Sequence, residues 1–159
     1  MPANQLALYV DSQFVSPYAM SAFVTLHEKG LPFDIRPLNL SARENYAVDY
    51  SAISLTCRVP TLVHGDFSLS ESSAISEYLE EQYPSPLYTA AYPHDIRDRA
   101  KSRQIQAWLR SDFISVRQER STEVVFIKPT DKPLSHEDCS HTSGFLVRLS
   151  PLSLMEFAE

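Results

Sequence analysis

The chain has 159 residues, a net charge of -6 at neutral pH and 43% hydrophobic residues. This length fits one typical domain, or a small α/β domain with part of a second. The acidic balance argues against a nucleic-acid-binding surface, and no apolar run approaches the ~20 residues that cross a membrane. Only three glycines are present, which excludes glycine-rich phosphate loops. Two distant cysteines and the lack of a secretory leader predict a cytoplasmic protein.

The first half of the chain predicts alternating strands and helices, beginning with a buried strand over residues 6–10. Ser16 and Pro17 are typical of a helix start, as N-cap and first helical residue, and this helix should run to about Lys29. Gly30 then closes it in a left-handed conformation. Residues at helical spacing should form its buried face, namely Ala19, Ala22, Phe23 and Leu26.

A second strand is predicted over residues 33–38, at a sheet edge because Pro37 cannot donate a ladder hydrogen bond. A short helix is expected over 42–48. Two further strands, at 61–64 and 67–69, flank a Gly-Asp pair that is typical of a tight hairpin turn. The sequence therefore predicts four strands, with helices inserted between them.

Another helix is expected within residues 70–79, ending before the prolines of a linker over 84–93. A longer helix should follow over 95–117. Its apolar stripe is predicted to contain Ile105, Trp108, Leu109, Phe113 and Val116, with Asp112 as a polar member. The order is therefore β-α-β-(α)-β-β-α, a linker and one long helix.

Three short segments carry polar groups suited to binding. Ser16 lies at a helix amino end, where N–H groups and the helix dipole favour a thiolate, although a plain capping role is commoner. Val59 precedes Pro60, and a cis bond there would present its backbone to an extended peptide, whereas an ordinary trans edge proline is commoner. Glu71 and Ser72 can hold an ammonium and a carboxylate group, or they can cap the following helix.

Together these segments resemble the glutathione transferase family over Leu6 to about Glu119. The resemblance is carried by the phrases V-S-P-Y, R-V-P, L-S-E-S-S-A-I, R-Q-I-Q-A-W-L-R-S-D and V-V-F, and it is closest to small bacterial YfcF-like members. The longer phrases are specific, whereas Ser-Pro-Tyr alone is weak. The resemblance implies an α/β thioredoxin-like N-terminal domain followed by a partial all-α C-terminal domain.

The resemblance also implies residue roles in binding the tripeptide glutathione as co-substrate. The hydroxyl of Ser16 would activate the sulfur, with Tyr18 as a less well placed alternative. The bond before Pro60 would be cis, and the adjacent backbone would pair with the cysteinyl part of glutathione. The implied glutathione-binding residues are Ser16, Arg58, Val59, Pro60, Glu71 and Ser72.

The implied function is a glutathione transferase or glutathione-dependent peroxidase, whose thiolate attacks a small electrophile or a peroxide. No metal is implied, and the family's usual state predicts a homodimer. The alternatives are a non-catalytic binding module, an inactive fragment, and a thiol–disulfide enzyme, which Ser16 in place of cysteine disfavours. Cys57 can form a mixed disulfide with glutathione or be a small packed side chain, the commoner case.

The second half departs from the family pattern. Domains are expected at 1–84 and 94–159, with no recognisable pattern from about Leu134. The chain should therefore hold only part of the second domain, leaving a weakened electrophile pocket, an exposed apolar stripe and low stability. The tail also holds His136, Cys139 and His141, whose spacing is only a weak coincidence with a metal site.

Overall fold

The computed structural model describes residues 5–135, and the chain divides into two compact units, residues 1–106 and 107–159. The first unit contains a four-stranded sheet in the order β2-β1-β3-β4. β1 pairs in parallel with β2 and antiparallel with β3, which in turn pairs antiparallel with β4. The strands are β1 (Leu6–Asp11), β2 (Phe33–Leu38), β3 (Thr61–His64) and β4 (Phe67–Ser70).

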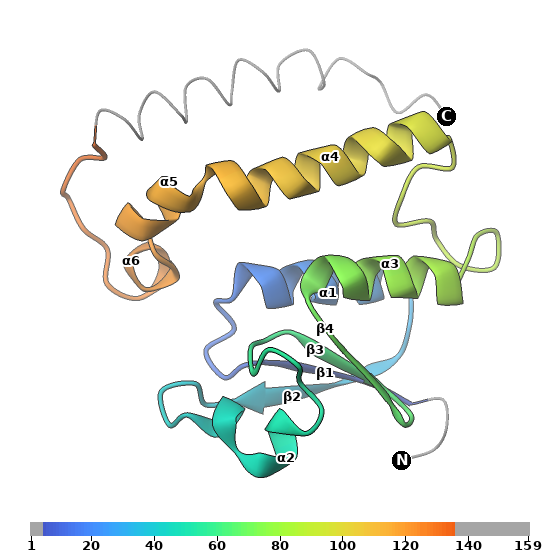
Figure 1. The fold of residues 1–159 in the computed structure, drawn as a ribbon, viewed down its shortest axis with the longest axis horizontal. Helices are drawn as coiled ribbons and strands as arrows, with labels where there is room; N and C mark the ends of the chain where they lie inside the picture. Colours follow the sequence, from blue (N-terminus) through green and yellow to red (C-terminus); the bar gives the residue numbers. More distant parts are fainter. Residues whose placement is uncertain (1–4, 136–159) are drawn as a thin grey trace. The chain divides into compact units, whose positions relative to one another are not determined.

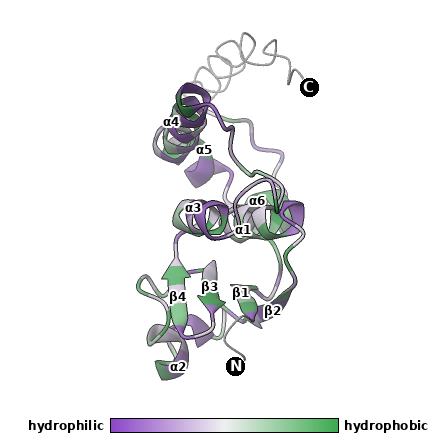
Figure 2. Ribbon diagram, turned by 90° about the vertical axis from the view of Figure 1, so that its right-hand side faces the viewer, coloured by the Kyte–Doolittle hydropathy of each residue, from purple (hydrophilic) through white to green (hydrophobic). Residues whose placement is uncertain are grey.

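Helices cover both faces of this sheet. Helices α1 (Pro17–Glu28) and α3 (Ser72–Gln82) lie together on one face, and the short α2 (Val48–Ser51) lies on the other (Figures 1 and 2). The two faces follow from strand alternation, since Tyr9 of β1 contacts the Tyr50 ring of α2 at 5.4 Å between centroids. This layered arrangement confirms the predicted thioredoxin-like domain.

The hydrophobic core lies between the sheet and the helices α1 and α3. Each fully buried leucine or isoleucine contributes about 1.5–3 kcal/mol, so a cluster of this size is the main stabilising feature of the unit. β1 is buried along nearly its whole length, as expected for a strand covered on both faces, whereas burial along α1 recurs at helical spacing, at Ala19, Ala22 and Leu26. The cluster contains Leu6, Leu8, Val10, Ala19, Ala22, Leu26, Leu31, Leu62, Ile75, Leu79 and Tyr83.

Two details of the elements predicted before residue 84 are wrong. Phe23 was expected on the buried face of α1, but it is 36% exposed and contacts the ring of Phe33 at the sheet edge. The expected helix over 42–48 is replaced by the 3-10 turn η1 (Glu44–Tyr46) and by α2. Local hydrogen bonds explain the second difference, because the Glu44 carboxylate accepts the Asn39 N–H at 2.7 Å and so closes a turn.

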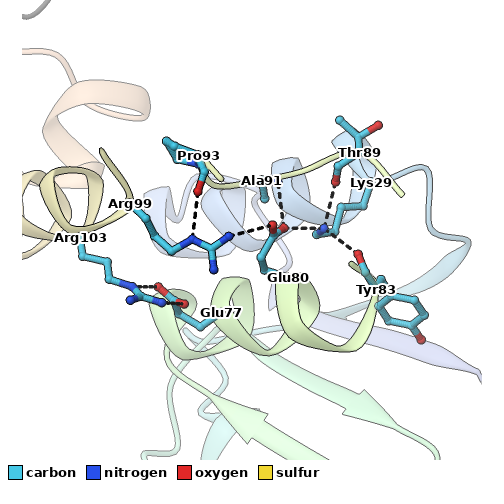
Figure 3. A network of polar contacts seen from close by, with 9 residues as sticks. All are labelled: Lys29, Glu77, Glu80, Tyr83, Thr89, Ala91, Pro93, Arg99 and Arg103. Atoms are coloured by element: carbon cyan, nitrogen blue, oxygen red, sulfur yellow. Dashed lines mark hydrogen bonds and ion pairs between the residues drawn. The ribbon is translucent and has the colours of Figure 1, made fainter. Parts of the chain in front are cut away.

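A buried ion pair and its hydrogen bonds hold the linker after α3 against α1 and α3 (Figure 3). The side chain of Lys29 is fully buried and pairs with Glu80 at 2.6 Å. Its ammonium also donates to the carbonyls of Tyr83 and Thr89, at 3.0 and 2.9 Å. The Glu80 carboxylate accepts the Ala91 N–H at 2.9 Å. The linker thus belongs to the compact first unit, whereas the predicted domain limits of 1–84 and 94–159 stay predictions.

The helix expected over 95–117 is interrupted at Phe113. Helix α4 (Ile96–Asp112) ends there, and α5 (Ile114–Glu119) begins. The interruption is stabilised by Arg117, whose guanidinium donates to the carbonyls of Leu109 and Arg110 at 2.8 and 2.5 Å. These carbonyls lie at the end of α4, where helical partners are missing.

A further short helix, α6 (Thr122–Phe126), was not predicted. Its N-cap Ser121 accepts the Val124 N–H at 3.4 Å. Within residues 5–135, no helix is long and apolar enough to cross a membrane.

Candidate functional site

The sheet brings the three candidate segments to one end of the first unit. Tyr9 near the end of β1 pairs with Thr61 at the start of β3, and Thr61 pairs with Ser70 at the end of β4. Ser16, Pro60 and the start of α3 therefore all lie at the same end of the sheet. Helices α1 and α3 both begin there (Figure 1). The sequence alone did not establish this convergence, because it depends on strand pairing.

Ser16 is the N-cap of α1, as predicted. Its Oγ accepts the Ala19 N–H at 3.3 Å, and Pro17 follows at the first helical position. This bond uses a lone pair of the hydroxyl oxygen, so the hydroxyl proton remains able to donate to an anion. The capping role and a sulfur-activating role are therefore compatible, because they use different parts of one hydroxyl group.

The loop before Ser16 is organised by Asp11, a residue that the sequence interpretation did not single out. Its buried carboxylate accepts the Val15 N–H at 2.9 Å and the Ser16 N–H at 3.1 Å. A signal was present in the sequence, since an Asp between a strand and a helix start is suited to binding loop N–H groups. Tyr18, the alternative hydroxyl, lies within α1 and is 42% exposed.

A cleft of about 230 Å³ adjoins Ser16 within the first unit. Its walls are formed by the end of β1, the following loop, one side of α1 and the edge strand β2. Six of its eight lining residues are apolar, so it is suited to an uncharged, apolar molecule. The lining residues are Val10, Asp11, Phe14, Ser16, Ala19, Met20, Phe23 and Ile35.

The bond between Val59 and Pro60 is cis, as the family resemblance implied. Val59 is half-buried, and no hydrogen bond to its backbone is found within residues 5–135. Arg58 is exposed, and its carbonyl accepts the Tyr50 hydroxyl at 2.7 Å. The backbone groups of Val59 are thus open to pairing beside the first residue of β3.

Buried hydroxyl groups support this segment from beneath. The Tyr50 hydroxyl lies 2.9 Å from Thr61 Oγ1, which donates to Ser54 Oγ at 3.0 Å. Ser54 Oγ lies 3.1 Å from Ser70 Oγ on β4. Burial raises the pKa of Tyr50 despite its hydrogen bonds to these hydroxyls, so the phenol stays neutral at physiological pH. Hydrogen bonds therefore link the segment around Arg58 to the end of β4.

Glu71 and Ser72 follow β4 and open α3. Glu71 occupies the N-cap with φ of 76°, a conformation that L residues rarely adopt, and its side chain makes no capping hydrogen bond. Glu71 therefore caps α3 through its backbone only, and its exposed carboxylate is not committed to the helix. Ser72 is the buried first residue of α3. Backbone strain at an exposed acid is more typical of a binding site than of a structural turn.

Cys57 is a partly exposed free thiol with φ of 51°, two residues before Val59. Its Sγ lies 3.9 Å from the Ser54 carbonyl, and its proposed mixed disulfide stays a prediction. Cys139 and the two tail histidines, His136 and His141, lie outside the described residues. In residues 5–135, no group of three potential metal ligands is found.

Family profiles match both halves of the chain. One, described as "Glutathione S-transferase, N-terminal domain", matches residues 15–82. A second, described as "Glutathione S-transferase, C-terminal domain", matches residues 95–151. The second match continues past Leu134, beyond which the residues alone gave no family pattern.

Individual relatives agree with these profiles. The chain is 32% identical over 103 residues to glutathione S-transferase theta-3 of Mus musculus, covering 65% of this chain and 41% of the relative. It is 35% identical over 101 residues to glutathione S-transferase Z1 of Arabidopsis thaliana, covering 64% and 43%. The chain thus spans about two fifths of the length of these curated relatives.

A solved structure of a glutathione transferase homolog from Burkholderia, with bound glutathione, shares 51% identity with this chain and superimposes with a TM-score of 0.64. The match covers 72% of this chain and 58% of that one.

Proposed function

Because this chain belongs to the glutathione transferase family, we propose that its first unit binds glutathione and activates the glutathione thiol. The observation that carries the proposal is the Ser16 hydroxyl at the start of α1, with its oxygen bonded to Ala19 N–H and an apolar cleft beside it. A thiolate at this helix end gains from the N–H groups, the helix dipole and the hydroxyl proton.

The other predicted residues supply the remaining contacts of an extended tripeptide. The free backbone N–H and C=O of Val59 pair with the cysteinyl residue, as an added strand would. The uncommitted carboxylate of Glu71 binds the ammonium group of the γ-glutamyl end. Ser72 and the N-terminal N–H groups of α3 bind the carboxylate of that end. Pro60 fixes the chain direction between these contacts.

The chemistry that follows is nucleophilic attack by sulfur. In conjugation, the thiolate forms a carbon–sulfur bond and the leaving group departs with its electron pair. With a peroxide, the sulfur takes one oxygen as the oxygen–oxygen bond breaks, and the remaining alkoxide or hydroxide leaves and takes up a proton. A second glutathione thiol then attacks the sulfur of the resulting sulfenic acid, giving glutathione disulfide and water. The apolar cleft beside Ser16 receives the electrophile in this proposal. Peroxidase activity, a cytoplasmic location and a homodimer remain predictions.

The test compares wild type with Ser16→Ala by titration calorimetry and by the pH dependence of thiolate absorbance in bound glutathione. We expect Ser16→Ala to raise the bound thiol pKa by about one to two units, because one donor to the anion is lost. Rates with a chromogenic electrophile and with hydrogen peroxide should fall correspondingly. Ser16→Gly is the matched variant, since glycine caps helices nearly as well as serine but lacks the hydroxyl.

Unchanged affinity and unchanged rates in both variants would remove Ser16 from the mechanism. Retention on immobilised glutathione without turnover of either substrate would instead favour the non-catalytic binding module.

A further inference from the structure

Asp11 gathers the backbone N–H groups of three consecutive residues. Its carbonyl accepts the Phe14 N–H at 3.0 Å. Its two carboxylate oxygens accept the N–H groups of Val15 and Ser16, at 2.9 and 3.1 Å. The residue is only 5% exposed, so these bonds form largely away from bulk water.

This carboxylate is balanced by backbone dipoles. No ion pair joins it to a basic side chain in the part of the chain that the structure describes. Successive N–H groups around an anion form a well-defined concave site, and charge-assisted bonds of this kind are about twice as strong as neutral ones. The loop is held at its other end by the Ser12 N–H, which donates to Leu38 of β2 at 2.8 Å.

The loop conformation depends on these bonds. Phe14 has φ of 57°, which a bulky residue adopts only when its surroundings enforce it. Asp11 therefore fixes the path of the chain from the end of β1 to the first residue before α1. The backbone position of Ser16, and with it the direction of the hydroxyl, follows from that path.

We propose that Asp11 is the positioning residue for Ser16, holding the Ser16 backbone so that its oxygen faces Ala19 N–H and its proton faces the sulfur of glutathione. This inference rests on the proposed function. It assigns Asp11 no contact with the reacting atoms; Asp11 acts through Ser16.

A positioning role and a simple charge effect of Asp11 change the pKa of the bound thiol in opposite directions. A carboxylate near a thiolate raises the thiol pKa by repulsion, so removing its charge alone would lower that pKa. Loss of positioning weakens the hydrogen bond from Ser16 and raises the pKa. Asp11→Asn tests the two directly, because the amide places an N–H donor against a backbone N–H donor.

The experiment uses the full chain and measures glutathione affinity, the bound thiol pKa and the rate against a chromogenic electrophile. We expect Asp11→Asn to raise the bound thiol pKa by about one unit and to lower the rate about tenfold. Affinity should change less than about threefold, because contacts at Val59 and Glu71 are retained. Asp66→Asn, the same change at the exposed β3–β4 turn, serves as the matched control and should leave all three unchanged.

A double-mutant cycle with Ser16→Ala decides whether Asp11 acts through the hydroxyl. If it does, Asp11→Asn has no further effect on the thiol pKa in the Ser16→Ala background. An equal pKa shift in both backgrounds overturns the inference, as does a lowered or unchanged thiol pKa in Asp11→Asn alone. If Asp11→Asn fails to fold, Asp11→Glu keeps the charge but displaces it, and the same criteria apply. A wild-type protein that neither binds glutathione nor lowers its thiol pKa would sink the proposed function itself.

Discussion

At the scale of single residues, Glu71 combines a strained backbone with a proposed binding role. Its φ of 76° suits glycine far better than glutamate. We expect Glu71→Gly to raise the free energy of unfolding by about 1 kcal/mol relative to Glu71→Ala, because only glycine relieves the strain. Denaturant unfolding measures this difference.

Both Glu71 variants remove the carboxylate proposed to hold the ammonium group of glutathione. Both should therefore bind glutathione at least about tenfold more weakly than wild type, in titration calorimetry. A stable Glu71→Gly variant with undiminished affinity would show that the strain has no connection with this ligand. Equal stability of the glycine and alanine variants would show that the conformation costs nothing.

At the scale of secondary structure elements, the sequence predicted those features that are set by interactions between neighbouring residues. The strand β1, the capped start of α1 and the left-handed Gly30 are each specified by neighbouring residues, and the structure confirms them. The interruption at Phe113 escaped prediction because it depends on Arg117 reaching back to carbonyls of α4. The exposure of Phe23 likewise depends on where the sheet ends.

Lys29 joins the end of α1 to α3 through a partner that is distant in the sequence. Its sequence context marks only the end of α1, whereas its ammonium lies buried against Glu80 of α3. We expect Lys29→Met to destabilise the protein by about 3–5 kcal/mol, because the Glu80 carboxylate is left buried without its partner. Equilibrium unfolding in urea measures the loss.

Two variants control this prediction. Combining Lys29→Met with Glu80→Leu should recover part of the lost stability, because no buried charge then remains unpaired. Glu81→Gln, an exposed neighbour on α3, should change stability by less than about 0.5 kcal/mol. A double variant no more stable than Lys29→Met would show that the linker carbonyls, and not the charge on Glu80, govern the loss.

At the scale of the whole molecule, the sequence predicted the residues of the candidate site better than their arrangement in space. Ser16, Val59 and Glu71 each lie next to a recognisable boundary of a strand or helix. Their convergence at one end of the sheet follows from the β1–β3 and β3–β4 pairings. The position of Asp11 between a strand and a helix start was a signal, but its bonds to the N–H groups of Val15 and Ser16 depend on the folded path of the loop.

The same long-range charges give the molecule a defined response to acid. Burial raises the pKa of Glu80, but hydrogen bonds from Lys29 and Ala91 outweigh it and leave that pKa below its ordinary 4.5. A bidentate bond from Arg103 likewise lowers the pKa of Glu77 (Figure 3). Both carboxyls are therefore harder to protonate in the folded than in the unfolded protein.

As the pH falls below about 4.5, the unfolded protein therefore binds more protons than the folded protein. The stabilisation that these carboxylates give above that pH is lost as the pH falls through their lowered pKa values in the folded protein. We expect the urea midpoint of wild type to fall steeply over this range. The Lys29→Met and Glu80→Leu double variant, which lacks one of the two carboxyls, should show a shallower fall. If the urea midpoints of the two proteins fell in parallel with pH, the ion pair of Lys29 with Glu80 would contribute nothing to acid sensitivity. Protonation of other carboxylates would then cause the loss of stability.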